Sequence, residues 1–136
     1  MRLGIVLFLL GLVTGFTLPL MENPRMGLSS HLEGVINGIF LVSLGLLWPH
    51  LRLGRIAKHI TLGFAVYGSF ANWLSTLLAG FWGAGEPMMP LAASGYTGTS
   101  MQEGLIVFGL ISLSIAVLIV SVIVLWGLRG PGPAET

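Results

Sequence analysis

Long apolar segments and short polar ones alternate along the whole chain. Four apolar segments, at about 3–20, 29–48, 57–82 and 103–127, are long enough to cross a bilayer, which takes roughly 20 helical residues. A segment rich in Gly, Pro and Ser, from about 84 to 100, is typical of a loop. We therefore predict an all-α fold, an integral membrane four-helix bundle that forms a single domain over residues 1–136.

Proline and serine residues indicate where the first two spans end and begin. The segment 16–21 offers no small-x-small cleavage site, so we expect the first span to be a helix and not a signal peptide. We expect Pro19 and Pro24 to end this span. Ser29 or Ser30 should then cap the second span.

The composition indicates that lipid is the solvent for this chain. Of its 136 residues, 54% are hydrophobic and only 8% are charged, whereas soluble domains carry about 25% charged residues. The net charge of +1, with few and dispersed basic residues, gives no support for nucleic-acid binding. Because the chain has no cysteine, disulfides, thiolate catalysis, iron–sulfur clusters and cysteine-ligated metals are excluded.

The basic residues indicate how the spans are oriented. Arg25 falls on one side of a four-span topology, and all other Lys and Arg residues fall on the opposite side. Because short cytoplasmic loops are enriched in Lys and Arg, we expect both termini to be cytoplasmic, with the protein in the inner membrane of a bacterium. The residues on the predicted cytoplasmic side are Arg2, Arg52, Arg55, Lys58 and Arg129.

The second span carries a histidine beside small residues. His31, Gly34 and Gly38 fall near one helical face by three-and-four spacing. The two glycines let another body approach the backbone, either a neighbouring helix or a flat cofactor whose metal His31 ligates. Taken alone, the pattern is more typical of helix packing and of a hydrogen-bonded structural histidine. A polar residue inside a membrane is nevertheless a hypothesis for a functional site.

Two amides lie at similar depths in adjacent spans. Asn37 and Asn72 both come out roughly 12–15 Å from the predicted span ends. They could bond to each other as a structural clasp, or they could line a pocket with Tyr67 at its floor. Glu33, four residues before Asn37, lies near headgroup depth, where water or the helix dipole can stabilise it.

Two stretches resemble a known enzyme family. Residues 23–38 (Asn-Pro-Arg-Met-Gly-Leu-Ser-Ser-His-Leu-Glu-Gly-Val-Ile-Asn-Gly) and residues 67–73 (Tyr-Gly-Ser-Phe-Ala-Asn-Trp) are similar to the hydroxylaminobenzene mutases and, more distantly, to the styrene oxide isomerases. The resemblance extends over essentially the whole chain. It implies a small integral membrane enzyme that assembles as a homotrimer and holds ferric haem b between subunits.

The resemblance also implies roles for individual residues. His31 would ligate the iron, which acts as a Lewis acid, and Gly34 and Gly38 would lie beside the haem. Asn37 would be a pocket residue. The remaining assignments are Tyr67 and Asn72 as substrate-side polar groups, with Tyr96 of the outer loop as a rival for the tyrosine role.

We therefore hypothesise a redox-neutral rearrangement of a small hydrophobic aromatic substrate that arrives through the lipid, hydroxylaminobenzene to 2-aminophenol. Asn37 and Asn72 would orient this substrate and Tyr67 could pass protons. The first alternative is conversion of an aryl epoxide to an aldehyde, as in the styrene oxide isomerases. The second is a non-catalytic small membrane subunit or transporter, which requires no role for His31.

Overall fold

The computed structural model describes residues 1–129, and residues 130–136 of the predicted domain lie outside the described residues. Four long helices, with their adjoining short turns, are each long and apolar enough to cross a membrane, which fits an integral membrane protein and confirms the predicted number of spans. These helices are α1 (Arg2–Thr17), α2 (Pro24–Leu47), α3 (Arg55–Trp82) and α5 (Ser100–Gly127); the short elements are η1 (Leu18–Leu20), η2 (Trp48–His50) and α4 (Pro90–Ala93).

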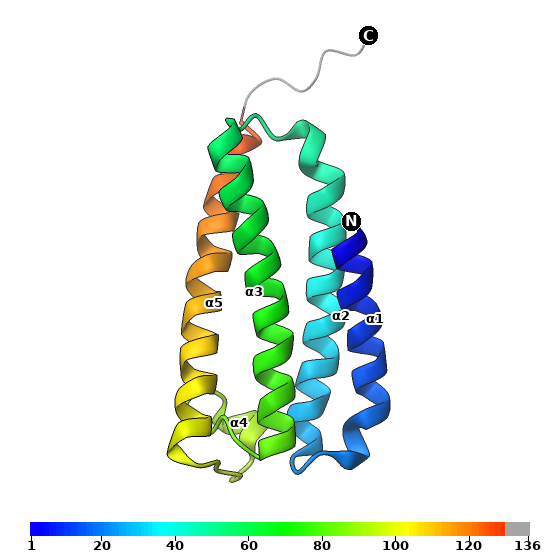
Figure 1. The fold of residues 1–136 in the computed structure, drawn as a ribbon, viewed down its shortest axis with the longest axis vertical. Coiled ribbons are helices and arrows are strands. Elements are labelled where there is room, and N and C mark those ends of the chain that lie inside the picture. The colour runs from blue at the N-terminus through cyan, green and yellow to red at the C-terminus, as the bar shows by residue number, and fades with distance from the viewer. Residues whose placement is uncertain (130–136) are drawn as a thin grey trace.

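The four long helices lie side by side in chain order (Figure 1). Helix α1 packs on α2, α2 on α3, and α3 on α5. The connection between α2 and α3 is at one end of the bundle, which we call the basic end. The segment containing α4 is at the other, which we call the loop end. Consequently α2 and α3, which carry most of the candidate residues, are the central helices and each has a long helix on either side.

Helix α2 begins at Pro24 and not near residue 29, so the predicted cap at Ser29 or Ser30 was wrong. The N-cap is Asn23, whose side-chain oxygen accepts hydrogen bonds from the backbone N–H groups of Arg25 and Met26 at 3.1 Å. A proline at the first helical position costs no hydrogen bond, and the residue before it favours the extended conformation that a cap adopts. Pro24 therefore starts a helix as well as following the end of one.

Asn23 also ties the loop end together. Its amide donates hydrogen bonds to the carbonyls of Ala92 and Ala93 at 3.1 and 2.9 Å, and its backbone N–H donates to the carbonyl of Gly80 at 3.0 Å. On the far side of the loop, Glu103 accepts backbone hydrogen bonds from Gly85 and Gly98, both at 2.8 Å. The loop predicted between about 84 and 100 is thus held near its middle by Asn23 and near its two ends by Glu103.

Glycines allow a close backbone contact between α1 and α2. A Cβ atom on Gly34 would lie 2.5 Å from the Cα of Gly11, and one on Gly38 would lie 2.6 Å from the backbone nitrogen of Phe8. Side chains cannot be accommodated at such distances, because the atoms that they meet belong to the backbone. The body that packs against Gly34 and Gly38 in this chain is therefore helix α1.

We predict that Gly34→Ala destabilises the protein by about 2 kcal/mol or more, because the added methyl group must push α1 away from α2. The matched control is Gly104→Ala, since a Cβ there meets nothing within 4 Å and alanine favours a helix over glycine. Thermal unfolding of both variants in the same detergent checks this. Equal melting temperatures for Gly34→Ala and Gly104→Ala would contradict the packing.

Candidate functional site

His31 lies on the side of α2 that faces α1. Its ring is half-buried, and Nδ1 lies 2.8 Å from the carbonyl oxygen of Gly11. Because a carbonyl can only accept, Nδ1 must carry a proton and donate it, so in the neutral ring Nε2 keeps a free lone pair. This is the tautomer found in metal-ligating histidines whose other nitrogen donates to a carbonyl.

The local sequence explains how the ring reaches that carbonyl. The contact of Gly11 with Gly34 brings the two helix backbones together. One turn further along α1, a Cβ on Gly15 would lie only 3.0 Å from Nδ1 of His31. Gly11 and Gly15 therefore make room, the first for the neighbouring backbone and the second for the imidazole.

A second polar group lies between α2 and α3 and consists of Glu33, Asn37 and Asn72, which we call the amide–carboxylate cluster. The side-chain nitrogen of Asn37 donates to the backbone carbonyl of Glu33 and to its Oε2, both at 2.9 Å. The side-chain nitrogen of Asn72 donates to the same Oε2 at 2.5 Å. All three side chains are half-buried.

The structure shows which hydrogen bonds Asn37 and Asn72 make. They do not bond to each other in the part of the chain that the structure describes; both bond to Glu33. The predicted depth of Glu33 rested on a helix start near residue 29. With α2 beginning at Pro24, Glu33 lies about 14 Å along the helix, level with Asn72, which lies about 15 Å from Trp82.

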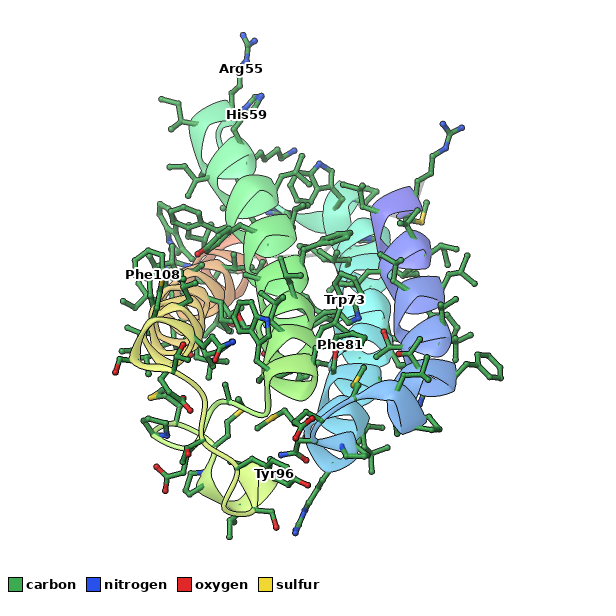
Figure 2. All side chains as sticks on the ribbon, turned by 60° about the horizontal axis from the view of Figure 1, so that its bottom comes forward. Arg55, His59, Trp73, Phe81, Tyr96 and Phe108 are labelled. Atoms are coloured by element: carbon green, nitrogen blue, oxygen red, sulfur yellow. The ribbon has the colours of Figure 1, made fainter. Side chains whose placement is uncertain are left out.

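Neither tyrosine bonds to this cluster. The hydroxyl of Tyr67 lies 2.6 Å from the hydroxyl of Ser112 on α5, so it belongs to the α3–α5 contact. Tyr96 is at the loop end, and His59 is at the basic end, where its Nδ1 donates to the carbonyl of Arg55 at 2.7 Å (Figure 2). The described structure therefore brings together Asn37, Asn72 and Glu33 among the candidates.

Two further bonds across the helices were not predicted. The hydroxyl of Ser30 donates to the backbone carbonyl of Trp73 at 3.0 Å, which links α2 to α3. The indole nitrogen of Trp73, on the side of α3 toward α2 and α1 in Figure 2, donates to the hydroxyl of Thr14 at 3.0 Å. Single serine and threonine residues in an apolar span gave no pattern from which these pairs could be found.

Ser69 differs from every other fully buried polar side chain of the described residues. Its hydroxyl is buried without a hydrogen-bond partner, although it lies one helical turn from Asn72. Leaving a buried hydroxyl unpaired costs about 1–3 kcal/mol. The unpaired hydroxyl of Ser69 therefore lowers the stability of the folded protein.

Fold and sites together define a four-span membrane protein with a half-buried histidine and a half-buried glutamate on its second helix. The sequence model of the styrene oxide isomerase family matches residues 1–129, and the chain belongs to this family.

Two relatives from Ectopseudomonas oleovorans carry the name hydroxylaminobenzene mutase. The chain is 67% identical over 129 residues to the mutase HabB, covering 95% of this chain and 79% of HabB. It is 45% identical over 125 residues to the mutase HabA, covering 92% and 93% of the two chains. No solved structure matches. The predicted resemblance is confirmed, and the names of the family and of its relatives indicate that the protein is an isomerase or mutase. A non-catalytic membrane subunit does not account for these matches.

We predict that Ser69→Ala raises the free energy of unfolding by about 1 kcal/mol, because it removes an unpaired hydroxyl. The matched control is Ser30→Ala, another fully buried serine, whose lost bond to Trp73 should lower the same quantity by about 1 kcal/mol. Unfolding in a denaturing detergent measures both. A destabilised Ser69→Ala would show that this hydroxyl has a partner in the native protein.

Proposed function

We propose that this enzyme rearranges hydroxylaminobenzene to 2-aminophenol, using ferric haem b held by His31, within a homotrimer. The proposal is supported by two relatives that are named hydroxylaminobenzene mutases. The observation that carries it is the hydrogen bond from Nδ1 of His31 to Gly11, which leaves Nε2 available as a ligand.

The donor set fits a haem better than a bare metal ion. Residues 1–129 contain no group of three or more His, Asp or Glu side chains that could hold a metal by themselves. A haem would bring its own nitrogen ligands and would need only one ligand from the protein, which His31 could supply. When bound, a ferric haem supplies a Lewis acid for the substrate oxygen.

The reaction needs no external oxidant or reductant. The N–O bond of the hydroxylamine breaks, and a C–O bond forms at the ortho carbon. That carbon loses a proton and the nitrogen gains one, so the product is an isomer of the substrate. Positive charge develops on the aromatic ring during the transfer, and water would capture it. Four helices that are apolar enough to lie in a membrane would keep bulk water away from such a site.

The amide–carboxylate cluster is the group that we propose to orient the substrate. Asn37 and Asn72 supply polar atoms at one depth, and Glu33 holds both amides in place. Tyr67 is paired with Ser112 in this chain, so proton transfer by Tyr67 stays a prediction that its contacts do not support.

Two sides of α2 are used in this proposal. His31 contacts α1, whereas Glu33 and Asn37 bond toward α3. A single chain therefore does not place the iron ligand and the amide–carboxylate cluster on the same face of α2. This supports a site completed by a neighbouring subunit, as in the proposed homotrimer with haem between subunits. We further propose that both termini lie on the cytoplasmic side of a bacterial inner membrane, because of the basic residues at that end.

The second candidate reaction is the conversion of an aryl epoxide to an aldehyde. The match to the styrene oxide isomerase family favours it. For such a substrate His31 would again hold the group that supplies a Lewis acid, and the apolar helices would keep water from the opened benzylic C–O bond.

We predict that the purified protein shows a Soret band and turns over hydroxylaminobenzene, and that His31→Ala loses both. The matched control is His59→Ala, because His59 is exposed at the basic end and should leave band and turnover unchanged. Absorption spectra and product analysis measure these outcomes. A colourless but folded and active wild-type protein would contradict the role of haem, and turnover of styrene oxide alone would contradict the substrate.

A further inference from the structure

Both amide hydrogens of Asn37 are used inside the protein. One is donated to the backbone carbonyl of Glu33 and the other to its Oε2, each at 2.9 Å. A backbone carbonyl can only accept, so the amide cannot be turned around without losing this bond. Asn37 can therefore offer a ligand nothing but the lone pairs of its oxygen.

The side-chain amide of Asn72 is oriented in the same way, with its nitrogen toward Glu33. Its nitrogen donates to Oε2 of Glu33 at 2.5 Å, which leaves it one N–H group and its oxygen. Oε2 thus receives two amide donors, one from each helix. Taken together, the amide–carboxylate cluster presents mainly acceptors: two amide oxygens and the carboxylate. None of the three side chains is fully buried in this chain.

An acceptor-rich site distinguishes the two candidate substrates. An arylhydroxylamine carries an N–H and an O–H group and can donate to these oxygens. An aryl epoxide has one oxygen and no polar hydrogen, so its lone pairs would face the lone pairs of the site. Sites built to pair with a donor reject analogues that lack it, because their own buried polar groups then stay unpaired.

We infer that Glu33 is a positioning residue that holds the amides of Asn37 and Asn72 with their oxygens available, and so selects hydrogen-bond-donating arylhydroxylamines over aryl epoxides. This inference rests on the proposed function and extends it to substrate choice. Glu33 acts on the substrate through the amides of Asn37 and Asn72.

The test compares kcat/KM for hydroxylaminobenzene and for styrene oxide in the purified, haem-containing enzyme. In Glu33→Gln one carboxylate oxygen becomes an NH2 donor of nearly the same shape. We expect the ratio of the two kcat/KM values to fall at least about tenfold. Glu33→Asp keeps a carboxylate and should recover part of the preference. Glu103→Gln is the matched control, because Glu103 also accepts two N–H groups but lies at the loop end, and its ratio should stay unchanged.

Binding of non-reacting ligands gives a readout that does not depend on turnover. Benzyl alcohol donates one hydrogen bond, and benzyl methyl ether of similar shape only accepts. Calorimetric titration should show tighter binding of the alcohol to the wild type, and loss of this preference in Glu33→Gln. If Glu33→Gln does not fold, Asn72→Ala tests the same point, because it removes one of the oriented amide oxygens.

The outcomes separate this inference from the proposed function. If the wild type converts hydroxylaminobenzene but Glu33→Gln lowers both kcat/KM values equally and binds the two ligands as the wild type does, the inference is wrong and the proposed function stands. If the wild type converts only styrene oxide, the proposed function itself fails. A tenfold or larger shift in the ratio, with an unchanged Soret band, supports the selection by Glu33.

Discussion

The account depends on one hydrogen bond, from Nδ1 of His31 to the carbonyl of Gly11. It forms only because two helix backbones approach each other at Gly11 and Gly34, where neither residue has a side chain. The bond settles which ring nitrogen carries the proton and therefore which one can bind a metal. The close packing of two apolar helices thus determines the tautomer of the His31 imidazole.

The same constraint shapes the rest of the bundle. In lipid there is no water to pair with polar groups, and several polar side chains pair across helices. Trp73 donates to Thr14, Ser30 donates to Trp73, and the amides of Asn37 and Asn72 share Glu33. Helix α2 is central to this arrangement, because one of its sides bonds to α1 and the opposite side bonds to α3. His31, the proposed ligand for iron, and Glu33 and Asn37, which we propose to help orient a substrate, therefore lie on one helix and point to different neighbours.

The sequence was sufficient for the four spans, because their apolar length is unambiguous, and for the family, because residues 23–38 interrupt an apolar helix with a distinctive set of polar residues. It was misleading at Asn23 and Pro24, where a proline that follows one helix also begins the next. This error placed Glu33 only about one turn from the start of its helix, so its bonds to Asn37 and Asn72 were not predicted. The bond of Tyr67 to Ser112 depends on the relative rotation of α3 and α5, which spacing within one helix does not determine.

The most direct test of the central claim is an experimental structure of the haem-containing protein in lipid. Our account predicts that iron is bound by Nε2 of His31 while Nδ1 of the same ring remains within hydrogen-bond distance of the carbonyl of Gly11. Iron on Nδ1, or a haem ligated elsewhere with His31 engaged only with protein, would contradict it.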